Sequence, residues 1–589
     1  MIYAGIFKDF SSSLFNLHEL IKAANERMGS TVYRDGGALE KSFNYNETDI
    51  GERKSFAGLI NTLAPEFTKE KGLMDFTKQG EKWELLKEAY TSPLGLMPRV
   101  GNLYQVYGTE NVWNDSEKML ALKEKLGETE QKYTSVYLPY SGYGAMRSGW
   151  DTTDSYMAFF NDNKRGLGHF FVGTNAVMNL TAHGRTLLMG GGVAYYGKRY
   201  VSQYPEFLEN GYEEINGYFS EDSTQRISTV MVNDKSQTPK NYYFTEEGEY
   251  DEGLNTGSNK CGYVNQTAID EPLGNRWLSD SHFDFCEGVF DNGYISDFGD
   301  METKNQTPPT KGTVTKDAVH NRQFIYVKDA DLFIVTDEME NTYKLSNNYR
   351  ALWHYPAYLE GSKLLTGFKE DQVVTDKENN RFYTTDTEGP NLYAYNFSDS
   401  DLKYEKYCGY FKKGELAWGW ADGGDDALLA KFTPRAEVHV RWSDEKRGDI
   451  TQVATAFVAS ENNSEPIVKK EDLSDENKTA FRLQTNEGVI VEYYNYKEKS
   501  RFYSDGINAM LKTLVLVKDS SGKKISAMAT DCNFMIVNNV IPVYMMSNNC
   551  SVEFGDNGFI KKVTRFDVPT YFDWKGDYEG DHVPVYTAE

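Results

Sequence analysis

The sequence predicts an α+β protein in which a helical N-terminal block is followed by antiparallel sheets of the β-sandwich class. Apolar residues recur at helical spacing up to about residue 130, and they alternate with period two from about residue 135. Turn-forming pairs such as Asp-Gly, Asn-Gly and Ser-Gly separate many of the alternating runs, which is typical of stacked antiparallel sheets. A chain of 589 residues is too long for one core, so we expect several domains.

The first domain is expected over residues 1–130. Helical periodicity is clear over 13–28, weaker over 55–67 and 81–90, and returns in a charged amphipathic stretch over 115–132. Two prolines, Pro93 and Pro98, interrupt the pattern and indicate a loop.

The remainder is predicted to be β-structure. We expect a large β-sandwich domain over 131–420, with a polar insertion near 235–315, and a β-rich C-terminal domain over 421–589. The clearest strand-like runs are 228–233, 322–328, 331–339, 436–442, 451–459, 488–496, 512–518 and 534–546.

One stretch, Val136 to Tyr196, is unusually dense in glycine and aromatic residues. Its strand-like runs are separated by turn-forming residues, and His169 lies in the glycine-rich sequence GLGHFF. Because histidine titrates near neutral pH, His169 is the candidate proton carrier of the stretch. We interpret the stretch as the active-site edge of a β-domain.

Composition excludes several classes of protein. A formal charge of −25 argues against a nucleic-acid binder, which needs a basic surface. No run of 18 apolar residues occurs, and the N-terminus lacks the pattern of a signal peptide. The five scattered cysteines contain no CxxC; Cys261 and Cys286 could pair in an oxidising compartment, although buried free thiols are expected. The 41 tyrosines suit either strands or a sugar-binding surface.

Four short motifs of the central stretch, MRSGW, GLGH, HGRTLL and GGGVAYY, resemble the heparinase II/III superfamily of polysaccharide lyases. This resemblance implies a helical (α/α) toroid packed on antiparallel sheets. The net charge and the lack of a long apolar run predict that neither nucleic acid nor a membrane is a partner. It also implies cleavage of an acidic polysaccharide by β-elimination, in the periplasm or outside the cell. Such a reaction needs a group that neutralises the uronate carboxylate, a base for the C5 proton and an acid for the leaving oxygen.

The resemblance assigns roles to individual residues. The segment 35–45 matches the family's pattern around its catalytic tyrosine, which makes Tyr45 the acid, the base or both. His169 matches the first histidine of the family's Gly-His-x-His motif and becomes the base or its orienter. Candidate substrate-binding residues are Asn46, Arg147, Trp150, Tyr196 and Tyr200.

Departures from the family concern its metal site. Phe171 replaces the second histidine, Gly173 stands in place of a nearby acidic residue, and Ile227 occupies the position of another metal histidine. A glycine turn at 190–192 replaces the family's aspartate. Since none of these side chains can ligate zinc, we expect no cofactor and no metal of the family type.

Two further points stay open. The helical part is short for a toroid, so the chain is either truncated or carries a reduced toroid; Asn16 and His18 are weak substitutes for the missing carboxylate partner. The alternative function is a catalytically degenerate relative that binds carbohydrate or serves a structural purpose. A glycoside hydrolase is a third reading, but no carboxylate pair stands out in the central stretch. The other strand histidines, at 183, 320, 354 and 439, are interpreted as structural.

Overall fold

The computed structural model describes a set of segments between residues 135 and 587, and the predicted helical block over 1–130 lies outside them. These segments are 135–138, 142–148, 153–161, 173–189, 224, 227–237, 273–295, 314–343, 345–356, 367–408, 436–538, 540–566 and 585–587. Within them the chain forms antiparallel strands and two short 3-10 turns, η8 (Lys328–Ala330) and η9 (Glu370–Gln372). No helix in this part of the chain is long and apolar enough to cross a membrane.

The central stretch forms a meander of five strands in the order β1-β2-β3-β4-β5. The strands are β1 (Val136–Leu138), β2 (Tyr143–Arg147), β3 (Tyr156–Phe160), β4 (Ala176–Ala182) and β5 (Arg185–Met189). Between β4 and β5 the chain turns at His183 and Gly184, both with positive φ, as a tight two-residue hairpin requires. The strand-like runs predicted here are therefore strands.

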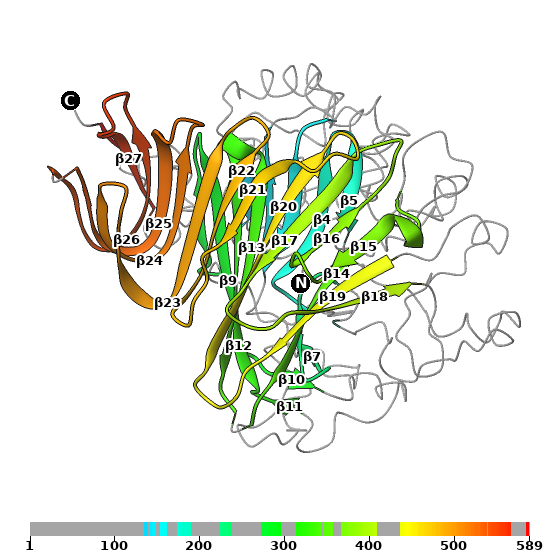
Figure 1. Cartoon of the computed structure of the whole chain (residues 1–589). Coiled ribbons are helices and arrows are strands. Elements are labelled where there is room, and N and C mark those ends of the chain that lie inside the picture. The colour runs from blue at the N-terminus through cyan, green and yellow to red at the C-terminus, as the bar shows by residue number, and fades with distance from the viewer. Residues whose placement is uncertain are drawn as a thin grey trace, which may run out of the picture.

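A sheet of eight described strands forms the middle of the molecule, in the order β15-β16-β17-β20-β13-β12-β9-β8. Its strands are β8 (Arg276–Ser279), β9 (Phe283–Phe290), β12 (Ala318–Val327), β13 (Leu332–Asn341), β15 (Val373–Asp376), β16 (Arg381–Thr384), β17 (Asn391–Phe397) and β20 (Ile450–Ser460). Strands β8 and β9 fall within the range predicted as a polar insertion, so part of that range belongs to this sheet. We call it the central sheet (Figure 1).

Two smaller sheets pack near one face of the central sheet. The first has the order β18-β19-β14-β6, and within the described residues the second has the order β11-β10-β7. Their strands are β6 (Val230–Val232), β7 (Ser236–Gln237), β10 (Tyr294–Ile295), β11 (Val314–Thr315), β14 (Asn348–His354), β18 (Lys403–Cys408) and β19 (Ala436–Ser443). Apolar side chains of β4, β14 and β19 share one core with those of β12 and β13, and Phe159 stacks on Phe324 at 4.4 Å.

The central sheet is buried on both faces. Along β12, Phe324 and Tyr326 enter the core shared with β14 and β19, whereas Ile325 and Val327 enter a second core on the opposite face. A strand covered on both sides lacks polar alternation, and this explains why the four residues 324–327 are continuously apolar in sequence.

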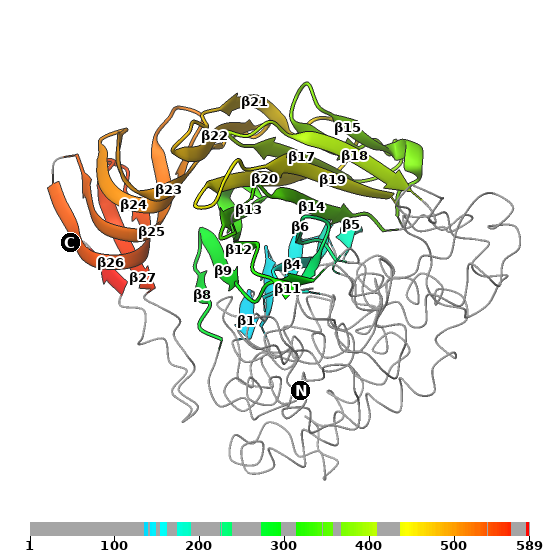
Figure 2. The ribbon, with the colours of Figure 1, turned by 90° about the horizontal axis from the view of Figure 1, so that it is seen from below.

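The second core joins the central sheet to the C-terminal sheet, which has the order β21 to β28 in sequence. Its strands are β21 (Ile467–Asp472), β22 (Lys478–Thr485), β23 (Ile490–Ser504), β24 (Ile507–Lys518), β25 (Lys524–Val537), β26 (Val540–Phe554), β27 (Ile560–Phe566) and β28 (Val585–Thr587). Phe397 stacks on Phe481 at 4.3 Å across this boundary. Figure 2 shows β21 and β22 on one side of the central strands and β1 and β4 on the other, which makes three layers.

The C-terminal sheet begins at Ile467, and β19 and β20, which lie beyond the predicted boundary at residue 420, pair with strands of the sandwich. Alternating apolar runs look alike in sequence whichever sheet they join, because pairing partners are set by long-range contacts. The three cysteines whose side chains the structure describes, Cys286, Cys532 and Cys550, are buried free thiols, as expected.

Candidate functional site

Most residues assigned a role by the sequence lie outside the described part of the structure. These are Tyr45, Asn46, Trp150, His169, Tyr196 and Tyr200. Their assignments stay predictions, and Arg147 is the candidate whose surroundings the structure describes.

Arg147 is the last residue of β2, and its side chain is buried. Its guanidinium carbon lies 4.9 Å from the centre of the Tyr156 ring, the residue opposite it on β3. Its backbone N–H donates to Ser135 Oγ at 2.9 Å. A guanidinium over an aromatic face is a stabilising cation–π contact, so this residue has a packing function whether or not it also binds a carboxylate.

Gly173 and Ile227, the two described positions that the sequence resemblance aligns with the family's metal site, lie next to each other. A Cβ atom built on Gly173 would be 3.0 Å from Ile227 Cδ1, and Ile227 is 1% exposed and packs with Ala176 and Met178. A hydrogen bond fixes the chain next to this contact, since the Thr174 N–H donates to Gln237 Oε1 at 2.6 Å. In the described segments no group of three His, Cys, Asp or Glu side chains is arranged to hold a metal ion.

A fully buried ion pair supports this region from the central sheet. Arg322 on β12 donates from Nε and Nη2 to the two carboxylate oxygens of Asp337 on β13, at 2.6 and 2.9 Å. Its Nη1 donates to the backbone oxygens of Asn175 and Ser228, at 2.8 and 2.7 Å. One guanidinium therefore joins three segments that are distant in sequence, and two of them border the Gly173–Ile227 contact.

His320 completes this cluster. Its Nε2 lies 2.7 Å from Asp337 Oδ1, and neither side chain is exposed. Burial alone would raise the pKa of Asp337, but the charge of Arg322 and the contact with His320 outweigh it and lower the pKa to about 2. Burial lowers the pKa of His320, because desolvation of the imidazolium outweighs the attraction of Asp337. In this cluster Arg322 and Asp337 form an ion pair, and the lowered pKa of His320 favours its neutral imidazole.

The sheet β18-β19-β14-β6 carries a second group of polar side chains on the face turned away from its core. We call this group the polar face, and its members are Arg350, His354, Glu405, Glu437, His439 and Arg441. The intervening residues, such as Trp353, Val438 and Val440, point into the sandwich core. On AEVHVRW, residues 436–442, strict alternation places Glu437, His439 and Arg441 on one face.

Glu437 lies between two histidines of the polar face. His439 Nε2 is 2.9 Å and His354 Nε2 is 3.6 Å from Glu437 Oε2, and Ser228 Oγ is 3.2 Å from His354 Nδ1. Burial, followed by the positive charge of Arg350, holds the pKa of His439 well below its usual value. His354, Glu437 and His439 are all buried, and the lowered pKa favours the neutral form of His439, so these side chains form a buried hydrogen-bonded cluster of the sheet.

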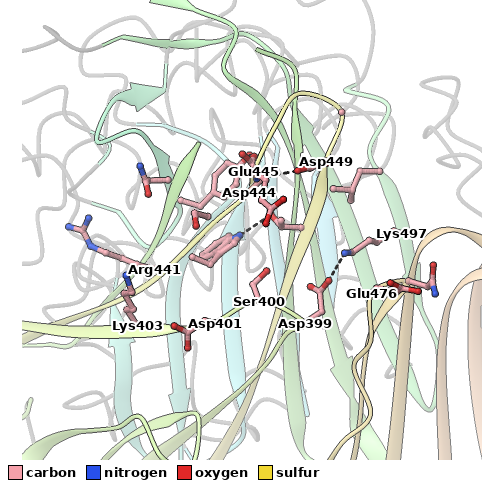
Figure 3. A pocket seen from close by; sticks show the side chains of 18 of the residues that line it. Asp399, Ser400, Asp401, Lys403, Arg441, Asp444, Glu445, Asp449, Glu476 and Lys497 are labelled. Atoms are coloured by element: carbon pink, nitrogen blue, oxygen red, sulfur yellow. Dashed lines mark hydrogen bonds and ion pairs between the residues drawn. The ribbon is translucent and has the colours of Figure 1, made fainter. Parts of the chain in front are cut away.

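Arg441 extends the polar face toward the surface. Its Nε pairs with Glu405 at 2.5 Å, and both residues also line a surface cleft of about 910 Å³. The cleft is lined by residues of β14, β18, β19 and β20 and, on the C-terminal side, by Glu476 and Asn477 just before β22 and by Lys497 and Glu498 of β23. Figure 3 shows most of these side chains. The other lining residues labelled there are Asp399, Ser400, Asp401, Lys403, Asp444, Glu445 and Asp449.

Sequence reasoning did not single out the polar face or the cleft. The alternation of 436–442 was a usable signal, because charged residues at every second position of a strand must all lie on one side. The cleft has no comparable signal, since its walls come from several separate segments between residues 348 and 500.

Comparison with known proteins gives a likeness in fold. The chain resembles heparan sulfate lyase structures. Heparan sulfate lyase HepC from Pedobacter heparinus is similar over 82% of this chain and 63% of that chain, with 14% identity and a TM-score of 0.40. Heparinase III is similar over 82% of this chain and 65% of that chain, with 11% identity and a TM-score of 0.39. This chain therefore spans less than two thirds of the length of these lyases.

A more distant likeness involves a putative aldose 1-epimerase from Escherichia coli K12. It covers 52% of this chain and 96% of that chain, with 6% identity and a TM-score of 0.20. No family model matches the sequence. No curated protein matches it either.

Proposed function

We propose that this protein is a polysaccharide lyase that cleaves a polymer containing uronic acid, either a glycosaminoglycan or an alginate-like chain, by β-elimination. The observation that carries the proposal is the presence, in one sequence, of the segment 35–45 that ends in Tyr45 and of the Gly-His turn at His169. The antiparallel sheets of the described segments are of the class that this resemblance implies.

The proposed mechanism distributes three tasks. A group near the cleaved bond, with Asn46 as the candidate, neutralises the uronate carboxylate so that the C5 proton becomes acidic. Tyr45 or His169 takes that proton, and Tyr45 returns a proton to the leaving glycosidic oxygen. Arg147, Trp150, Tyr196 and Tyr200 are proposed to bind the sugar chain.

Ultraviolet absorbance tests the proposal directly, because β-elimination creates a C4–C5 double bond conjugated to the carboxylate. We expect absorbance to rise when the protein is incubated with at least one of a panel of acidic polysaccharides. The Tyr45→Phe variant should lose about 10²-fold or more of that rate, since it lacks the phenolic proton. Tyr503→Phe is the matched control, because Tyr503 is 78% exposed on the C-terminal sheet and is expected to keep the full rate.

One result would contradict the proposed activity, and a second would contradict the proposed role of Tyr45. The first is no rise with any polymer of the panel, also with a longer form of the protein that has additional N-terminal residues. The second is a rise that Tyr45→Phe leaves unchanged, which would remove Tyr45 from the mechanism while leaving lyase activity established.

The proposed substrate also implies a compartment. Polymers of this kind lie outside the cytoplasm, so we propose a periplasmic or extracellular location. Cell fractionation with an antibody against the protein tests this point, and recovery with the cytosolic fraction would contradict it.

One observation favours a second candidate, a catalytically degenerate relative that binds carbohydrate. Gly173 and Ile227 lie side by side at positions where the resemblance places metal ligands, and neither residue offers a side-chain group that can bind zinc. For this candidate, isothermal titration should detect binding of an acidic polysaccharide while absorbance stays constant.

A further inference from the structure

The C-terminal sheet is attached to the β8–β9 side of the central sheet by apolar packing and by polar contacts. Met528 of β25 is buried in the second core together with Leu278 of β8 and Phe283 of β9. Ser526, two residues before Met528, faces the same side of the strand and donates from Oγ to Asp329 Oδ2 at 2.9 Å. Because Asp329 lies in η8, between β12 and β13, this hydrogen bond joins the two sheets.

His282 holds the carboxylate that accepts this hydrogen bond. The imidazole lies in the turn between β8 and β9, and its Nδ1 is 3.0 and 2.9 Å from the two carboxylate oxygens of Asp329. The side chains of His282 and Asp329 are 17% and 21% exposed, so protons can reach them from the solvent. Histidine is the side chain that changes its charge near neutral pH. The boundary between the two sheets therefore contains a group that titrates in this range.

Three carboxylates act on this imidazole, and they belong to both sheets. Asp280 and Asp329 lie on the side of the central sheet, whereas Glu553 lies on β26, opposite Ser526 of β25. The hydrogen bond with Asp329 raises the pKa of His282, burial opposes this, and the charges of Asp329, Asp280 and Glu553 raise it further. A protonated His282 therefore compensates negative charge on both sides of the boundary.

The lysines near this cluster are paired, and they do not titrate near neutral pH. Lys328 pairs with Asp284 at 2.8 Å and also donates to the backbone oxygen of Asp280. Lys561 pairs with Glu553 at 2.6 Å, and the charge of Lys562 acts on the same carboxylate. Since lysine stays protonated between pH 6 and pH 8, the change of charge expected at this boundary comes from His282.

We propose that His282, Asp329, Ser526 and Glu553 form a pH-dependent clasp, which holds β25 and β26 on the central sheet when His282 is protonated and loosens when it is neutral. The imidazolium keeps Asp329 in position for Ser526 through a charge-assisted hydrogen bond. Loss of the proton leaves Asp329 and Glu553, which belong to different sheets, without this compensating charge.

The direction of the pH dependence follows from the raised pKa of His282. The contribution of the clasp is complete below about pH 6.5, and it is lost as pH rises through the folded pKa. The C-terminal sheet is therefore held most firmly in acidic surroundings. The inference goes beyond the proposed lyase activity and does not depend on it.

Amide hydrogen exchange tests the clasp, because it measures local opening of individual strands. Protection factors, corrected for the intrinsic pH dependence of exchange, are compared at pH 6 and pH 8. We expect protection over residues 525–529 of β25 to fall with rising pH, by about threefold or more beyond any change over 324–327 of β12. Equal changes in the two strands would overturn the proposal, since His282 would then affect only the stability of the whole protein.

Variants separate the clasp from other contacts at the same boundary. His282→Gln should remove the additional pH dependence of β25, and Ser526→Ala should lower its protection at pH 6 by about threefold or more. Arg276→Gln is the matched control, because Arg276 pairs with Asp531 at 3.1 Å across the same boundary and keeps its charge throughout. It should lower protection of β25 by the same factor at both pH values.

Two results with these variants would overturn the proposal. One is a pH dependence of β25 that persists in His282→Gln, because another group would then be responsible. The other is an Arg276→Gln variant that abolishes the pH dependence, because the clasp would then not act independently of that ion pair. Neither result bears on lyase activity, since none of these residues is placed in the cleavage site.

Discussion

At the scale of single residues, the buried Arg322–Asp337–His320 cluster shows how a charge is retained inside an apolar core. Arg322 and Asp337 are both completely buried. All three guanidinium nitrogens of Arg322 donate hydrogen bonds, two of them to Asp337 and one to backbone oxygens. A buried ion pair adds little compared with an apolar pair of the same volume, but loss of one partner leaves an uncompensated charge. His320 was interpreted as structural from the sequence, and its burial beside Asp337 agrees with this.

Asp337→Asn removes the charge of the carboxylate and retains its shape. We expect the free energy of unfolding to fall by about 3–5 kcal/mol, because Arg322 would remain buried without a counter-ion. Urea denaturation at pH 7 measures the change. Asp556→Asn is the control, since that residue is exposed and its pairing with Lys523 should contribute little. A loss below about 1 kcal/mol for Asp337→Asn would show that the cluster relaxes or admits water.

At the scale of elements, strand positions followed from alternation, but strand partners did not. Gly144 on β2 lies opposite Phe159 on β3, and the Phe159 ring covers the glycine and stacks on Phe324 of the central sheet. A glycine in a strand often marks such a close approach, although the sequence does not show which aromatic ring will cover it. This contact connects the five-stranded meander to the central sheet.

Gly144→Ala tests that contact. The added methyl group would overlap the Phe159 ring, which cannot move away because Phe324 supports it from the other side. We expect the free energy of unfolding to decrease by about 1–3 kcal/mol, the usual cost of overpacking a core. Gly555→Ala, in a turn where the nearest atom is 3.2 Å from the new methyl group, should have a much smaller effect. Thermal unfolding of the two variants checks the difference, and equal melting temperatures would contradict it.

At the scale of the whole molecule, burial controls how stability responds to pH, and two histidines should act in opposite directions. The pKa of His320 is lowered, so the unfolded chain binds a proton before the folded one as pH falls below about 6.5, and stability is lost. The hydrogen bond to Asp329 raises the pKa of His282 despite partial burial. Its contribution is complete below about pH 6.5 and is lost as pH rises through the folded pKa.

Urea denaturation of His282→Gln and His320→Gln from pH 5 to pH 8 separates the two effects. The stability of the wild-type protein relative to His282→Gln should be greatest at pH 5 and decrease toward pH 8. Relative to His320→Gln, it should decrease toward pH 5. Each slope is at most about 1.4 kcal/mol per pH unit for a single proton. Slopes of the same sign for both variants would refute the assignment of the two shifts.

The sequence by itself determined the change from helical to alternating periodicity, the positions of most described strands and the motifs that suggest a lyase. These features depend on residues close together in the chain, where side-chain direction follows directly from backbone geometry. Only the tertiary structure decided that the central sheet is covered on both faces, that β19 and β20 belong to the sandwich, and that Gly173 contacts Ile227. It also brought β18 and β19 together with β23 and the turn before β22 to form a cleft. Each of these features depends on which distant segments bury each other's apolar surface, and alternating strands of similar composition leave that choice open.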